Sequence, residues 1–163
     1  MHYRELRLPT NTGRLAHLCL PNSQLLVRGL KDAPLDLTET RAWSGTPLLL
    51  SADADAQLDE DFVKTSPAPH VLVVTDGSWR QASKASKREP ALRDLRRVRL
   101  PVTTPSRYHL RREPHIEGLS TIEAIARALG ALESPEVQAE LERIFSLMVE
   151  RTMRSRGTPL RNA

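Results

Sequence analysis

The chain has 163 residues, of which 39% are apolar and 27% charged, and its formal net charge is +4. This length suffices for one globular domain with a buried core, and the composition excludes wholesale disorder. No run approaches the roughly 20 apolar residues of a membrane span, and the first residues lack the apolar segment of a secretory signal. The single cysteine, Cys19, excludes an internal disulfide framework and a cysteine-cluster zinc site. We therefore expect one domain over residues 1–163, cytoplasmic, with no membrane association and no obligate protein partner.

Positive charge gathers in one segment of the chain. Residues 78–113 hold eleven Lys or Arg against three acidic residues, and in the whole sequence Arg outnumbers Lys by twenty to four. The flat, forked guanidinium suits phosphate and stacks on bases. This pattern is compatible with a polyanionic partner such as RNA, and equally with a solvated basic face.

Short β-like runs alternate with helical segments, which predicts an α/β domain with a mostly parallel sheet flanked by helices. The expected strands are the apolar runs at 25–27, 48–50, 71–74 and 98–100. The run at 71–74 is apolar throughout, as is typical of a strand covered on both faces. Residues 52–69 predict a short helix and a loop. Residues 101–118, which contain three prolines, predict a long loop, and such loops in a compact domain are usually functional.

Two helices are predicted near the C-terminal end. Ser120 and Glu123 form a capping box before the first, and Gly130 is expected to end it. The second is expected to begin after Ser134, with Pro135 at its first position. Its expected buried stripe consists of Val137, Leu141, Ile144, Phe145 and Met148.

Common catalytic signatures are missing from the sequence. It contains no G-x-G-x-x-G, P-loop, G-x-S-x-G or H-E-x-x-H pattern. His109 and His115 share one predicted loop but lack further ligands at a metal-binding spacing, so no metal is expected.

The segment around Asp76 carries the strongest local signal. The apolar run at 71–74 leads into Asp76 and Gly77, and a helix is expected to begin directly after Trp79. Ligands of open α/β sheets bind beyond the carboxyl ends of strands, where this turn lies. A structural interpretation is also open, with Asp76 as an N-cap and Trp79 as a core aromatic, and the spacing alone favours it.

Several short motifs follow one another in a fixed order. They are Thr10-Asn-Thr-Gly-Arg-Leu-Ala16, Asp76-Gly-Ser-Trp79, Leu100-Pro101, Ser106-Arg-Tyr108-x-Leu-Arg111 and Leu119-Ser-Thr-Ile-Glu-Ala124. Together they resemble the DTW-domain family, whose members are tRNA-uridine aminocarboxypropyltransferases. The family usually has Thr where Ser78 stands, and many bacterial members carry an N-terminal cysteine cluster that is absent here.

The resemblance implies a domain related to the SPOUT RNA-modifying fold, with a C-terminal trefoil knot that holds S-adenosylmethionine. The implied reaction transfers the 3-amino-3-carboxypropyl group of S-adenosylmethionine to N3 of a tRNA uridine and releases methylthioadenosine. A SPOUT-type RNA methyltransferase and a non-catalytic RNA-binding module are the alternatives.

The implied reaction suggests roles for individual residues. Asp76 is the candidate base for the N3 proton, or else it orients the amino end of the donor. Trp79 would face the sulfonium cation, or else fill the core. The residues expected to bind S-adenosylmethionine are Leu50, Ser51, Asp76, Ser78, Trp79, Leu100, Pro101, Tyr108, Thr121 and Ala124. The residues expected to bind tRNA, unless they form only a solvated face, are Arg80, Lys84, Lys87, Arg88, Arg107, Arg111 and Arg112.

Overall fold

The computed structural model of the protein describes residues 1–38, 45–66, 68–101, 106 and 118–157. The chain divides into two units, each made of two stretches of sequence. The first unit comprises residues 1–8 and 22–101, and the second comprises residues 9–21 and 102–163. The expectation that residues 1–163 act as a single domain stays a prediction.

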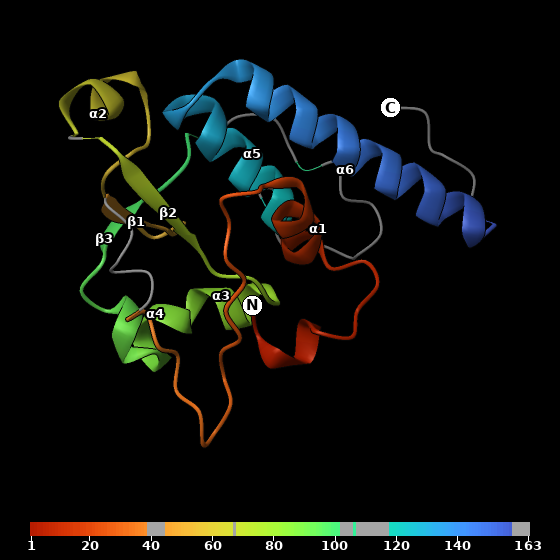
Figure 1. Cartoon of the computed structure of the whole chain (residues 1–163), viewed down its shortest axis with the longest axis horizontal. Coiled ribbons are helices and arrows are strands. Elements are labelled where there is room, and N and C mark those ends of the chain that lie inside the picture. The colour runs from red at the N-terminus through yellow and green to blue at the C-terminus, as the bar shows by residue number, and fades with distance from the viewer. Residues whose placement is uncertain (39–44, 67, 102–105, 107–117, 158–163) are drawn as a thin grey trace. The chain divides into compact units, whose positions relative to one another are not determined.

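A parallel sheet forms the centre of the first unit, and its strands lie in the order β2-β1-β3. The strands are β1 (Thr46–Leu50), β2 (His70–Val74) and β3 (Arg96–Val98). Leu50 pairs with both Val74 and Val98, so the carboxyl ends of the three strands lie side by side (Figure 1). The predicted α/β class with a parallel sheet is therefore confirmed.

Short helices occupy the connections between these strands. They are α2 (Glu60–Thr65), α3 (Trp79–Ser83), α4 (Ala85–Arg88) and η3 (Pro90–Leu92), whereas η1 (Tyr3–Glu5) lies before β1. Parallel strands need such crossover connections, because a tight turn cannot join them. The carboxylate of Asp59 caps α2 by accepting a hydrogen bond from the Phe62 backbone N–H at 3.0 Å. This confirms the short helix expected within residues 52–69.

The central strand β1, and not β2, is the strand covered on both faces. Leu48 and Leu49 are consecutive and only 0% and 2% exposed, and consecutive side chains of a strand point to opposite faces. All five residues of β2 are only partly buried. The apolar run at 71–74 is thus a strand, as predicted, but an edge strand of this sheet.

Two strand predictions need correction. Residues 25–27 form no strand, and the adjacent Arg28 forms only an isolated bridge with His2. The predicted strand at 98–100 ends at Val98, because the Arg99 N–H donates instead to the Ala56 carbonyl at 2.9 Å. At Arg99 the available hydrogen-bonding partner decided the outcome, and no local pattern encodes that partner.

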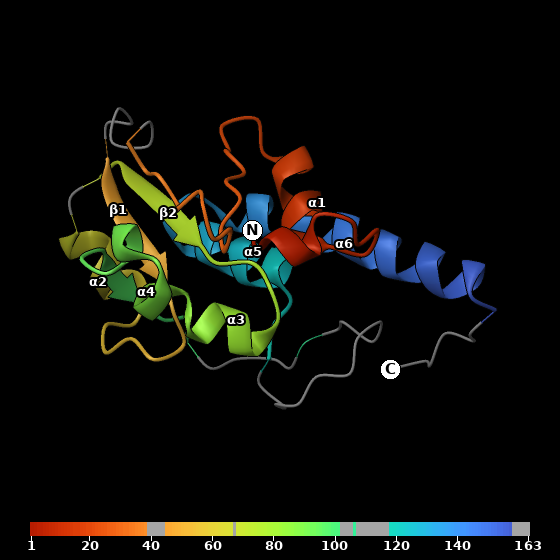
Figure 2. The ribbon, with the colours of Figure 1, turned by 90° about the horizontal axis from the view of Figure 1, so that it is seen from below.

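The second unit is helical, and α1 (Thr12–Cys19) packs against both α5 (Thr121–Leu132) and α6 (Pro135–Ser155) (Figure 2). The capping box at Ser120 and the start of α6 at Pro135 are as predicted. An apolar cluster joins the three helices through Ala16, Ile122, Phe145, Val149 and Met153. The predicted stripe of α6 is confirmed at its buried members, Leu141 and Phe145, and continues to Met153.

Gly130 does not end α5, which runs on to Leu132. A Cβ atom added at Gly130 would lie 2.1 Å from Oε1 and 3.0 Å from Cβ of Gln138 in α6. The glycine therefore allows α5 and α6 to approach closely, and this packing role explains a residue that the sequence suggested as a helix stop.

The loop predicted at 101–118 lies outside the described residues, except for Pro101, Ser106 and Gly118. Ser106 donates a hydrogen bond from its hydroxyl to the buried Glu123 carboxylate at 2.6 Å.

In the part of the chain that the structure describes, no helix is both long and apolar enough to cross a membrane.

Candidate functional site

The carboxyl edge of the sheet brings together several residues expected to bind the donor. Leu50 ends β1 and Ser51 follows it, Asp76 stands two residues beyond β2, and Leu100 and Pro101 come after β3. Because the three strand ends are in register, the segments that follow them start at the same edge. This edge is where ligands of open α/β sheets bind.

The polar groups of Ser51 stabilise the turn that follows β1. Its backbone N–H donates to the Val98 carbonyl at 2.9 Å, and its hydroxyl donates to the Asp53 carboxylate. That second hydrogen bond holds the pKa of Asp53 below its ordinary value. Direct donor binding by Ser51 stays a prediction.

Asp76 is buried, with 6% of its surface exposed, and two residues far from it in the sequence form hydrogen bonds to its turn. Its carbonyl oxygen accepts a hydrogen bond from the His2 backbone N–H at 2.9 Å and one from the Arg28 guanidinium at 3.4 Å. The same Arg28 nitrogen also donates to the Gln81 carbonyl at 3.1 Å. The turn that carries Asp76 is thus tied to the N-terminal segment and to the first helix after β2.

Arg28 is a buried cation near two buried carboxylates. Arg28, Asp76 and Glu89 are between 4% and 6% exposed. Burial lowers the pKa of the Arg28 guanidinium, and the negative charges of Glu89 and Asp76 act in the opposite direction. The Nε atom of Arg28 is buried without a hydrogen-bond partner in the described structure. The sequence analysis did not identify Arg28 as a site residue. The only sequence feature that pointed to it is its position directly after the apolar run at 25–27.

The interpretation of Asp76 as an N-cap is wrong, because Ser78 caps α3. The Ser78 backbone N–H donates to the side-chain oxygen of Gln81 at 2.8 Å, which completes a capping box. Gly77 has a φ of 152°, and a Cβ atom there would lie 2.9 Å from the same Gln81 oxygen. The helix start therefore leaves Asp76 outside the cap and requires the glycine beside it.

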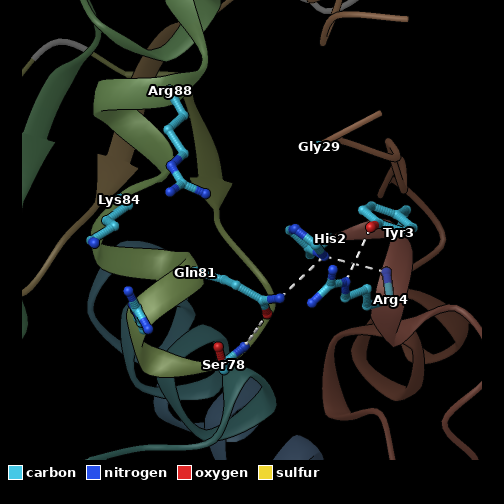
Figure 3. Close-up of a pocket in the computed structure, with 9 residues that line it drawn as sticks. His2, Tyr3, Arg4, Gly29, Ser78, Gln81, Lys84 and Arg88 are labelled. Atoms are coloured by element: carbon cyan, nitrogen blue, oxygen red, sulfur yellow. Dashed lines mark hydrogen bonds between the residues drawn. The ribbon is translucent and has the colours of Figure 1, made fainter. Parts of the chain in front are cut away.

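A polar pocket of about 410 Å³ lies between the N-terminal segment and the α3–α4 region, within the first unit. Figure 3 shows Ser78, Gln81, Lys84 and Arg88 on one side of it and His2, Tyr3 and Arg4 on the other. The lining residues are His2, Tyr3, Arg4, Gly29, Ser78, Arg80, Gln81, Lys84 and Arg88. Four of them are cationic and none of these described lining residues carries a carboxylate, so the pocket is suited to an anion.

The imidazole of His2 forms part of this pocket as a neutral group. Its Nδ1 accepts a hydrogen bond from the Arg4 backbone N–H and lies near the Gln81 amide nitrogen, each at 3.3 Å. Burial is the main cause that lowers the pKa of His2, and the neighbouring cations Arg28 and Arg4 lower it further. Near pH 7 the ring therefore keeps Nδ1 as an acceptor and carries its proton on Nε2.

The profile of the DTW domain matches residues 1–153. The chain belongs to the DTW domain family. It is 39% identical over 99 residues, 60% of this chain, to "tRNA-uridine aminocarboxypropyltransferase 2" of Drosophila melanogaster. The proteins of the same name from Macaca fascicularis and Mus musculus are 31% and 32% identical over 81% and 71% of this chain.

These alignments cover 39%, 46% and 40% of the fly, macaque and mouse proteins, so this DTW-family chain spans less than half the length of the curated relatives that it matches. No solved structure matches the chain significantly.

The expected tRNA-binding residues of this DTW domain fall into three groups. Arg80, Lys84 and Arg88 line the pocket. Lys87 is exposed on α4 and is not among the lining residues. Arg107, Arg111 and Arg112 lie outside the described residues, as do Tyr108 and the side chain of Trp79.

The remaining expected donor-binding residues, Thr121 and Ala124, lie in α5 of the second unit. The Thr121 backbone N–H donates to the Thr12 hydroxyl at 3.1 Å, which links α5 to α1. Glu123 is structural, as predicted, because its carboxylate accepts hydrogen bonds from the Ser120 N–H at 2.8 Å and the Ser120 hydroxyl at 2.7 Å. Among the residues described in both units, no three His, Cys, Asp or Glu side chains gather into a metal-binding group.

Proposed function

We propose that this DTW-family chain transfers the 3-amino-3-carboxypropyl group of S-adenosylmethionine to N3 of a uridine in tRNA. The names of the matched relatives support this reaction class, and their activity implies S-adenosylmethionine as the donor. The structural observation that carries the proposal is the buried Asp76, fixed in the turn beyond β2 at the carboxyl edge of the sheet. A SPOUT-related fold with a C-terminal trefoil knot, and action in the cytoplasm, are parts of the same proposal.

The proposed chemistry needs a proton acceptor at the uridine. N3 of uracil carries an imide proton and is a weak nucleophile until that proton leaves. The Asp76 carboxylate takes the proton, and the N3 electron pair then forms a bond to the γ-carbon of the methionine part of the donor. The bond between that carbon and the sulfonium sulfur breaks, and its electron pair stays on sulfur. The products are the modified uridine, neutral methylthioadenosine and a proton on Asp76.

The fixed backbone around Asp76 suits this role, because a general base must be held within hydrogen-bond reach of the proton that it removes. His2 and Arg28 both bond to the Asp76 carbonyl, so they fix the main chain from which the carboxylate projects. Leu50, Leu100 and Pro101 stand at the same edge and would contact the donor through main chain and apolar surface.

The test is nucleoside mass spectrometry of unmodified tRNA incubated with the purified protein and S-adenosylmethionine. Wild-type protein is expected to yield aminocarboxypropyl-uridine together with methylthioadenosine. Asp76→Asn keeps the shape and removes the base, so the rate should fall by about 10²-fold or more with unchanged tRNA affinity, and a cooperative thermal transition above the assay temperature checks that the variant is folded. Asp94→Asn, which changes an exposed carboxylate of the same unit, is the matched control and should retain full activity.

Other products would contradict the proposal in distinct ways. A methylated nucleoside would show that the chain is an RNA methyltransferase. Salt-sensitive tRNA binding without any product or any S-adenosylmethionine binding would show an RNA-binding module. Full activity of a folded Asp76→Asn variant would remove Asp76 from the mechanism.

A further inference from the structure

The pocket beside the Asp76 turn concentrates positive charge from separate segments of the chain. Arg80, Lys84 and Arg88 stand four residues apart, and Arg4 comes from the opposite side of the pocket. Figure 3 shows the guanidinium groups of Arg4 and Arg88 extending toward the space between the two sides. Like charges at a spacing of four residues repel one another on a helical segment, so the arrangement does not stabilise the helices themselves.

Two of these cations, Lys84 and Arg88, differ from three other cations of the molecule. Lys64, Arg143 and Arg154 each form an ion pair with a glutamate on their own helix. Within the described residues, neither Lys84 nor Arg88 forms an ion pair with a carboxylate. The pocket thus presents positive charge that the described part of the chain does not neutralise at these two positions.

Neighbouring groups orient one of the cations. The Arg4 Nε donates to the Tyr3 hydroxyl at 3.0 Å, and the guanidinium carbon lies 5.6 Å from the centre of the Tyr3 ring. That bond uses one of the five N–H donors of the guanidinium. A guanidinium oriented in this way loses less conformational freedom when it binds a phosphate than a free one does.

We propose that this basic pocket, defined by Arg4, Arg80, Lys84 and Arg88, binds backbone phosphate of the RNA substrate. The proposal rests on the proposed function, since it takes RNA to be the substrate. Four cations around one cavity match the repeated charge of consecutive phosphodiesters, whereas a donor carboxylate is satisfied by one forked guanidinium. The two aromatic rings among the described lining residues, His2 and Tyr3, stack on each other with centroids 4.8 Å apart, so the cationic side chains are the groups that contact the RNA backbone.

The pocket shares residues with the turn that carries Asp76, so a phosphate bound in it is held beside the candidate site. Ser78 and Gln81 line the pocket and also form the capping box two residues beyond Asp76. His2 lines the pocket with its ring while its backbone N–H bonds to the Asp76 carbonyl. Phosphate bound here fixes the register of the RNA relative to the Asp76 turn, which is the role that phosphate contacts have in nucleic-acid recognition.

The test compares two arginines of the same unit. Arg88→Ala removes a lining cation, and Arg93→Ala removes an exposed cation that is not among the lining residues. For Arg88→Ala we expect the Kd for tRNA to rise about tenfold and the slope of log K against log salt to fall by about 0.7 to 0.9. For Arg93→Ala we expect both to stay within twofold of wild type, and the KM for S-adenosylmethionine should be unchanged in both variants.

Two further variants, together with melting temperatures, distinguish a loss of tRNA binding from a loss of folding. Arg4→Ala removes a cation from the opposite side of the pocket and should reproduce the loss of Arg88→Ala, and Arg88→Lys should keep most of the salt slope because it keeps the charge. Melting temperatures identify any variant that has lost its fold.

Three results would overturn the proposal. Equal losses in Arg88→Ala and Arg93→Ala would show diffuse attraction to a basic surface. A raised KM for S-adenosylmethionine with unchanged tRNA affinity would show that the pocket binds the donor carboxylate instead of RNA. Absence of tRNA binding by the wild type would also refute the proposed phosphate site. Failure of the proposed function alone gives a different result. The wild-type protein would then bind tRNA through Arg88 but make no aminocarboxypropyl-uridine, which supports the phosphate pocket and contradicts the proposed reaction.

Discussion

The two units of the protein bury charged side chains in different settings. The helical unit is centred on an apolar cluster that includes Ile122 and Phe145. The sheet unit has an apolar cluster around Leu49, but it also buries the charged residues Arg28 and Asp76. Burial of a charge is costly unless partners compensate it, so such groups gather where a protein must fix a polar arrangement. Here they gather beside the candidate site, whereas the buried carboxylate of the helical unit, Glu123, is compensated by its hydrogen bonds to Ser120 in the capping box.

The apolar character of the helical unit predicts the largest loss of stability. Phe145 is 1% exposed and contacts the cluster that joins the three helices. Phe145→Ala should lower the free energy of unfolding by about 3–5 kcal/mol, because it removes buried surface and leaves a cavity. Urea unfolding followed by circular dichroism measures this loss. A loss below about 1 kcal/mol would show that the cluster does not hold the helices together.

In the sheet unit, we expect the free energy of unfolding to fall when a buried charge is removed, even where the side-chain volume is kept. Arg28→Met keeps the length and apolar stem of the side chain but leaves Asp76 and Glu89 buried without their neighbouring cation. We expect a loss of about 3 kcal/mol, at the lower end of the values for a broken buried charge pair.

A double variant shows whether charge is the cause of that loss. Adding Glu89→Gln to Arg28→Met removes one of the uncompensated carboxylates, so part of the lost stability should return, as urea unfolding of the set of four proteins would show. Strict additivity of the two substitutions would contradict the electrostatic explanation and leave packing and the lost hydrogen bonds of Arg28 to the Asp76 and Gln81 carbonyls as the cause.

The smallest expected effect concerns pH and His2. The pKa of His2 is lowered in the folded protein from its ordinary value of 6.5, so below that pH the unfolded chain binds more protons than the folded one. Stability should therefore fall as the pH drops through 6.5 toward the lowered pKa, and should be independent of this group at higher pH. Unfolding measured at several pH values should show a weaker dependence in His2→Asn, which keeps a short hydrogen-bond acceptor. Identical profiles for both proteins would contradict the role given to His2.

Local signals in the sequence determined most of the helical unit. The capping box at Ser120, the proline at 135 and the spacing of Leu141 and Phe145 all act within a few residues, so they predicted α5 and α6 directly. The end of α5 was predicted wrongly, since the role of Gly130 depends on Gln138 in the neighbouring helix.

The sequence also indicated the Asp76 turn and the basic residues that follow it, because a continuous apolar strand ends there and a helix begins. It did not indicate that Arg28 would be buried against that turn, or that Arg4 would face Arg88 across a pocket. Those pairs are 48 and 84 positions apart along the chain. Which distant residues meet depends on strand pairing and chain crossover in the sheet unit, and these are properties of the tertiary structure that no short stretch of sequence encodes.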